Sequence, residues 1–357
     1  MTRRELLFLP AALSGAARAV AASEPQSVSF PLEAIQGVVT PAELFFVRNH
    51  FVEPEISLSS WKLRVEGRVE RPFDWTINDL LGAPKKSLEA VLECAGNPAG
   101  GQSVSNGVWE GVPLGYVLDQ ARPRQEAASV LFEGADQGEL SAGSPRLPYC
   151  QIVPLSKCAG GESLLAYRLN GGSLPKRNGF PARALIPEWY GMDSVKWLTR
   201  IVVLGPSDQD TPFHSSGISR LYNRVWKTPA GERLERLSEI AVKSAIAWPN
   251  ALPGEPAVLP EGIHYVWGFA WTGSSVIRSV ELSTDGGKTW TAAQLESAPR
   301  RSTWVRWSCF WRASAGEYIL MSRASDLAGN RQPLARDPAR ADAYELNWCA
   351  PLRCVVS

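Results

Sequence analysis

The chain has little histidine, with only His50, His214 and His264 among its 357 residues. Zinc and copper sites commonly draw several of their ligands from histidine, so a multi-histidine metal site is not expected. The six cysteines contain neither a CxxC nor a CxxCH spacing. This absence excludes a zinc ribbon and a covalently attached c-type haem, so no haem is expected in this chain.

The chain also lacks a strong excess of charge of either sign. Lysine and arginine number 37 and aspartate and glutamate 36, which leaves a net charge of +1. A nucleic-acid or anionic-membrane surface would call for a basic excess, so neither partner is expected. Beyond the first residues, no stretch reaches the ~20 apolar residues of a membrane-spanning helix.

The first residues have the composition of an export signal. Arg3 and Arg4 precede an apolar run that continues to Ala17, and small residues follow at positions 19–22. A charged start, a short apolar middle and a small-residue end predict an export signal over residues 1–22. The arginine pair favours the twin-arginine route and therefore a periplasmic location, with an ordinary Sec signal or a membrane anchor as the alternatives. Whether the signal is cleaved stays open.

The remaining chain is long enough for about two domains. Residues 23–40 are expected to form a loose arm, and residues 41–210 mix strand and short-helix patterns. Residues 211–243 are polar and irregular, as an interdomain connection is. From residue 244 to 357 nearly every pattern is a strand, with Asp-Gly and Ala-Gly turns. The fold class predicted is therefore α+β, followed by an all-β sandwich of the immunoglobulin-like type.

Local patterns place several elements within these domains. Residues 61–67 alternate apolar and charged side chains, which is typical of a half-buried strand. Residues 87–93 form a strand candidate that runs directly into Cys94 and the turn at residues 95–97. Further expected elements are short helices at 76–81 and 113–118 and strands at 265–271, 280–283, 289–290, 303–307 and 317–321.

Cysteine pairing is open at this stage. In an oxidising compartment, Cys150 could pair with Cys158, or Cys349 with Cys354. Cys94 has no such neighbour in the sequence. By residue type alone, a single cysteine is more often a small buried hydrophobe than a reactive group.

Several short motifs, taken in order, change the interpretation of Cys94. They are Arg48-Asn49-His50, Cys94-Ala95-Gly96-Asn97, Gly179-Phe180-Pro181-Ala182-Arg183 and Ser194-Val195-Lys196-Trp197-Leu198. Together they resemble the molybdenum-binding domain of the sulfite oxidase family. The later Gly268-Phe269-Ala270-Trp271 and Asp285-Gly286-Gly287-Lys288 resemble its dimerisation domain. The resemblance extends from about residue 41 to 335.

The resemblance implies a molybdenum–molybdopterin cofactor whose metal is bound by the Cys94 thiolate. It implies that Arg48 and His50 receive the substrate oxyanion and that Tyr222 donates a hydrogen bond near the metal. The alternative for Arg48 is a surface ion pair, and for Tyr222 an exposed linker position. The cofactor-binding residues that the resemblance implies are Asn49, His50, Cys94, Asn178, Arg183, Ser194 and Lys196.

The implied activity is the oxidation of sulfite to sulfate by oxygen-atom transfer, in a homodimer that passes electrons to a separate acceptor such as a c-type cytochrome. One departure weakens the case for sulfite: Pro98 and Ala99 follow the cysteine turn where animal and plant members have paired arginines. The alternatives are a molybdenum-dependent reductase of S-oxides, such as methionine sulfoxide, and a non-enzymatic periplasmic binding module.

Overall fold

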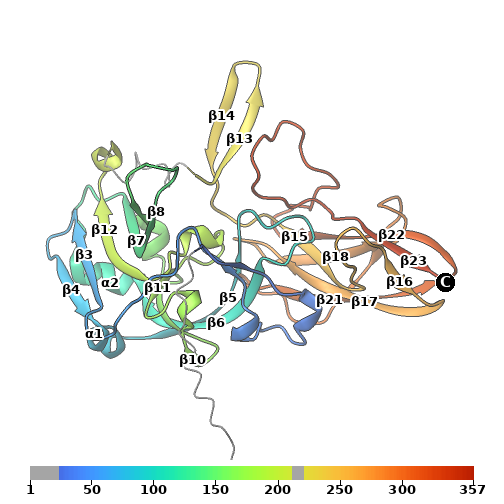
Figure 1. The fold of residues 1–357 in the computed structure, drawn as a ribbon, viewed down its shortest axis with the longest axis horizontal. Helices are drawn as coiled ribbons and strands as arrows, with labels where there is room; N and C mark the ends of the chain where they lie inside the picture. The colour runs from blue at the N-terminus through green and yellow to red at the C-terminus, as the bar shows by residue number, and fades with distance from the viewer. Residues whose placement is uncertain (1–23, 211–220) are drawn as a thin grey trace, which may run out of the picture.

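The computed structural model describes residues 24–210 and 221–357 (Figure 1). The predicted export signal and the first part of the expected connection, residues 211–220, lie outside the described residues. Within the described ranges, none of the helices has both the length and the apolar run that crossing a membrane requires.

Residues 24–210 form twelve strands and three short α-helices. The strands are β1 (Ser27–Val28), β2 (Val47–Arg48), β3 (Lys62–Gly67), β4 (Phe73–Thr76), β5 (Lys86–Glu93), β6 (Val104–Pro113), β7 (Ser129–Gly138), β8 (Leu147–Pro154), β9 (Leu164–Leu169), β10 (Gly172–Ser173), β11 (Arg183–Leu185) and β12 (Leu198–Leu204). The helices are α1 (Ile77–Gly82), α2 (Leu114–Ala121) and α3 (Leu155–Ala159).

The second half is built of strands. They are β13 (Asn223–Thr228), β14 (Gly231–Arg236), β15 (Lys243–Trp248), β16 (Ala257–Leu259), β17 (Gly262–Trp271), β18 (Ile277–Ser283), β19 (Thr291–Ala292), β20 (Gln294–Leu295), β21 (Val305–Ala313), β22 (Gly316–Asp326) and β23 (Leu352–Val356). Strands account for 44% of the structure and helices for 11%, so the fold is mostly β and the helical share of the predicted class is small.

Two sheets make up the first domain. One has the order β4-β3-β12-β7-β8, in which β12 runs parallel to β3; the other has the order β10-β9-β6-β5, with β11 paired to β9. The predicted alternation along β3 is present, because Leu63 and Val65 are fully buried whereas Lys62 and Arg64 are exposed and Glu66 is half-buried. Helix α1 begins with a capping box between Thr76 and Asp79, which satisfies two backbone N–H groups at its start.

The arm expected to be loose is packed against the rest of the molecule. Leu32 and Ile35 are almost fully buried in a cluster that joins the two domains. Strand β1 pairs with β2, with Ser27 opposite Arg48. Burial of two large apolar side chains outweighs the polar composition of the segment, and the arm fixes the backbone at Arg48.

The second domain has two sheets that share one apolar core. Their orders are β15-β17-β21-β20 and β16-β23-β22-β18-β19. The expected strand at 289–290 begins two residues later, as β19, because the Asp285 carboxylate accepts hydrogen bonds from the backbone N–H groups of Lys288 and Thr289. The immunoglobulin-like class of this sandwich stays a prediction.

The connection contains a hairpin that the sequence analysis did not predict. Strands β13 and β14 pair in full register and project from the molecule between the two domains (Figure 1). The backbone of residues 339–341 runs alongside β13, and Arg224 forms ion pairs with Glu235 and Glu345. These long-range contacts explain why a segment with a polar, irregular sequence is ordered.

Candidate functional site

A cavity that is open to solvent lies among residues of the first domain and Tyr222. All the residues predicted to bind cofactor or substrate line it, although they come from six separate parts of the chain. The predicted residues that line it are Arg48, Asn49, His50, Cys94, Asn178, Arg183, Ser194, Lys196 and Tyr222.

Cys94 lies at one end of the cavity, directly after strand β5. Its backbone N–H donates to the Ser103 carbonyl at 2.9 Å, and its carbonyl accepts from the Asn97 N–H at 2.9 Å, which closes a tight turn. Burial raises the pKa of the Cys94 thiol, and Glu93 adds to this rise, whereas Arg48 and Lys243 oppose it. A sulfur on a rigid turn at the end of a strand is well placed to bind a soft metal.

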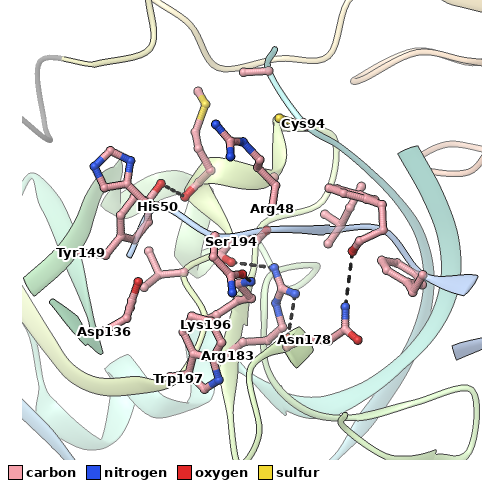
Figure 2. A pocket seen from close by; sticks show the side chains of 18 of the residues that line it. Arg48, His50, Cys94, Asp136, Tyr149, Asn178, Arg183, Ser194, Lys196 and Trp197 are labelled. Atoms are coloured by element: carbon pink, nitrogen blue, oxygen red, sulfur yellow. Dashed lines mark hydrogen bonds between the residues drawn. The ribbon is translucent and has the colours of Figure 1, made fainter. Parts of the chain in front are cut away.

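Arg48 and His50 lie at the same end as Cys94 (Figure 2). Arg48 is exposed, and strand β1 holds its backbone. The His50 ring contacts Phe51 and Tyr149, with centroid separations of 4.6 and 5.5 Å. Burial, aided by the charge of Arg48, lowers the pKa of His50, so the imidazole is neutral near pH 7.

Tyr222 joins this end of the cavity from the second half of the chain. It forms a hydrogen bond with Tyr149, and its ring lies 5.3 Å from that of Tyr344. Burial raises the pKa of Tyr222 to about 12. The phenol therefore stays protonated and can donate a hydrogen bond. It is a lining residue, not an exposed linker residue.

The opposite end of the cavity holds two cations, the buried Arg183 and the partly buried Lys196 (Figure 2). Arg183 donates to the carbonyl oxygens of Asn178 at 2.9 Å and Ser194 at 2.7 Å. Lys196 donates to the Asn49 side-chain oxygen and to the Arg177 carbonyl. All of these partners are neutral. Burial lowers the pKa of Arg183 to about 9 and that of Lys196 to about 7.

Several polar atoms beside these cations have no hydrogen-bond partner within the described part of the chain. They include Nδ2 of Asn49 and Oδ1 of Asn178, both on buried side chains. The Ser194 hydroxyl accepts from the Ile186 N–H at 2.9 Å, so its own hydrogen remains available to a ligand. Buried polar groups without partners are rare in folded proteins, and here they line a cavity.

The structure adds Asp136 and Tyr149, which the sequence analysis missed. A register shift between Glu133 and Gln137 interrupts the pairing of β7 with β8, and Asp136 lines the cavity within it. Gly134 is required there, because a Cβ would lie 2.7 Å from the Lys196 carbonyl. β-bulges often redirect side chains beside functional sites. Burial raises the pKa of Asp136 to about 7, although Lys196 opposes the rise.

The cysteine pairs considered above are not formed. Cys158, Cys349 and Cys354 are free thiols, which excludes both pairings in this structure. Burial raises the pKa of Cys158 to about 12 and that of Cys349 to about 11. These two cysteines are fully buried and behave as small core side chains.

Comparison with known proteins identifies the family. Residues 50–211 match the family model described as the oxidoreductase molybdopterin binding domain, and residues 235–340 match the Mo-co oxidoreductase dimerisation domain. The chain is 32% identical to sulfite oxidase of Gallus gallus over 343 residues, covering 88% of this chain and 72% of that protein. The chain belongs to the sulfite oxidase family. It is therefore a molybdopterin-dependent oxidoreductase, and a non-enzymatic module is set aside.

Other members of the family broaden the range of activities. Mitochondrial sulfite oxidase of Drosophila melanogaster is 32% identical over 82% of this chain, and nitrate reductase [NADH] 1 of Arabidopsis thaliana is 28% identical over 83%. The chain spans 55% and 36% of the lengths of these two proteins. The crystal structure of the sulfane dehydrogenase SoxCD from Paracoccus pantotrophus covers 92% of this chain and 87% of its own, at a TM-score of 0.77 and 28% identity.

The cavity fits the cofactor of the sulfite oxidase family. Arg183 and Lys196 supply positive charge, and their hydrogen bonds go to neutral oxygens, which suits the phosphate of molybdopterin. Asn49 and Asn178 offer unpaired polar atoms to its ring system. Among the described residues, no group of three or more His, Cys, Asp or Glu side chains could hold a metal alone. Cys94 would therefore contribute one ligand, with the others supplied by the cofactor.

Proposed function

We propose that this chain oxidises sulfite to sulfate and passes the electrons to an external acceptor such as a c-type cytochrome. The observation that carries the proposal is the position of Arg48, an exposed cation that shares one end of the cavity with Cys94. A guanidinium offers planar, permanently charged donors that suit a sulfur oxyanion. Sulfite oxidase relatives of 32% identity support the same substrate class.

Three residues of the chain would bind and orient the substrate. Arg48 would bind the oxyanion, and the neutral imidazole of His50 would complete the pocket without adding a second fixed charge. The Tyr222 phenol would donate a hydrogen bond to the oxygen that lies nearest the metal. The bound cofactor would supply the two-electron redox chemistry and the oxygen-atom transfer.

A sulfane substrate is the second candidate. The family member with the matching crystal structure is named a sulfane dehydrogenase. Pro98 and Ala99, which follow the Cys94 turn, are uncharged and add no cation to Arg48. Reduction of S-oxides is less well supported, because the matching relatives named above are sulfite oxidases, a nitrate reductase and a sulfane dehydrogenase.

The test is sulfite-dependent reduction of cytochrome c by protein matured in a molybdenum-replete host. Replacing Arg48 with Met should raise KM for sulfite about 10- to 100-fold, because a hydrogen bond to a charged group contributes about 1.5–3 kcal/mol. Arg71→Met, an exposed arginine outside the cavity, is the matched control and should leave KM unchanged. Molybdenum-loaded protein that turns over a sulfane but not sulfite would establish the second candidate instead.

We further propose that the chain is exported to the periplasm and acts as a homodimer. Export rests on the arginine pair and apolar run of residues 1–22. The match to a dimerisation domain supports the dimer, and the sandwich, which we infer to be immunoglobulin-like, offers an apolar face for it. On strands β17 and β21, Ile263, Tyr265 and Phe310 are 59%, 37% and 72% exposed.

A further inference from the structure

A buried ion pair joins the second domain to the loop that carries Cys94. Glu93, the last residue of β5, and Lys243, the first residue of β15, have side chains that are each 2% exposed. The Lys243 Nζ lies 2.9 Å from the Glu93 carboxylate and also donates to the Asn97 carbonyl at 3.0 Å. One ammonium therefore contacts the residue before Cys94 and the residue that ends its turn.

The Glu93 carboxylate is fully engaged. Besides Lys243, it accepts from the Asn97 amide nitrogen at 2.9 Å and from the Trp271 indole at 2.8 Å. Lys243 and Trp271 are opposite one another in the pairing of β15 with β17. Lys243 and Trp271, which are paired in the second domain, thus both bind the Glu93 carboxylate of the first domain, next to Cys94.

Stability alone does not account for these charges. A buried ion pair loses solvation on both sides, and an apolar pair of similar volume often stabilises a protein at least as well. The surrounding domain interface is already apolar, with Val91, Ala95 and Phe269 in its cluster. What distinguishes the pair is its place next to Cys94.

We propose that Lys243 is a positioning residue for the Cys94 loop and that the balance of charge between Lys243 and Glu93 sets the reduction potential of the bound metal. This inference rests on the assignment of Cys94 as the metal ligand. A cation near the ligand sulfur stabilises the reduced metal, which carries less positive charge, and an anion disfavours it. The second domain would then tune the chemistry of the first without touching the substrate.

The test is a redox titration of the molybdenum-loaded enzyme, followed by electron paramagnetic resonance, for Lys243→Gln, Glu93→Gln and the double variant. Glutamine keeps hydrogen-bonding capacity and removes charge. Lys243→Gln should lower the midpoint potential, and Glu93→Gln should raise it. Each shift should be about tenfold in the ratio of oxidised to reduced metal, or about 59 mV for a one-electron couple. The double variant should return to the wild-type potential.

Trp271→Phe is the matched control, because it removes a donor to Glu93 but no charge, and it should leave the potential unchanged. Shifts of the two single variants in the same direction, or no shift in either, would overturn the inference. If Lys243→Gln does not fold, the midpoint potentials of Glu93→Gln and the double variant are compared instead. The double variant should have the lower potential of the two, because it also lacks the Lys243 charge. Wild-type protein without molybdenum would instead contradict the proposed function, so the two failures are distinguishable.

Discussion

Replacing Lys196 with Met should change how the stability of the cofactor-free protein depends on pH. Burial lowers the pKa of Lys196 from 10.5 to about 7 in the folded protein. The unfolded chain keeps the ammonium protonated up to about pH 10.5, so between these values the unfolded state binds more protons. Stability should therefore rise with pH over this interval, and the rise should be absent in the variant.

The whole lowering of the Lys196 pKa corresponds to about 5 kcal/mol in the free energy of unfolding, because each pKa unit is worth about 1.36 kcal/mol. Between pH 7 and 9.5, the contribution of Lys196 to the free energy of unfolding should be about 3 kcal/mol. Arg183 and Asp136, whose pKa values are also shifted, are present in both proteins. The difference between wild type and variant therefore reports Lys196 together with its coupling to these two groups.

The assay is urea unfolding of cofactor-free wild type and Lys196→Met at both pH values. Lys62→Met is the control, because Lys62 is exposed on β3. An equal pH response in wild type and Lys196→Met would refute the claim that burial in the cavity lowers the pKa of Lys196. The variant matured with cofactor should also retain less molybdopterin than wild type, since the phosphate loses a partner.

Two further predictions concern the dimer and the ion pair between Arg236 and Asp193. Phe310→Glu should place charge on the exposed face of β21 and yield monomers in light scattering, with the fold intact by circular dichroism; a variant that remains dimeric would move the interface elsewhere. Arg236→Met should lower the free energy of unfolding at pH 9 by about 1–3 kcal/mol, because the fully buried Asp193 loses its hydrogen-bonding cation at 2.7 Å. In Asp193→Asn the same arginine change should cost much less, and equal costs would argue against the pairing.

The site was predictable from the sequence where short motifs carry the chemistry. Arg48, Cys94 and Lys196 lie in motifs that resemble one family, and the structure brings these distant motifs to one cavity. Asp136 has no such signal, because a bulge between two strands directs it into the cavity, and a bulge depends on register with a partner strand. Tyr149 likewise could not be predicted as a cavity residue, because its sequence context is that of an ordinary strand.

The fold was predictable where local patterns decide it. The alternation in β3 and the run of β5 into Cys94 follow from residues next to one another in the sequence. The packed arm and the β13–β14 hairpin depend instead on contacts with distant segments. The contact between Glu93 and Lys243 joins residues 150 positions apart, and no local sequence pattern predicts it.

The most direct test of the central claim is X-ray absorption at the molybdenum edge, on wild type and Cys94→Ser matured in the same host. We expect molybdenum in the wild type with a sulfur ligand from the protein in addition to those of the pterin. In Cys94→Ser, we expect one sulfur ligand fewer and no turnover, with an unchanged fold by circular dichroism. An identical sulfur coordination in both proteins, or a wild type without molybdenum, would contradict the account.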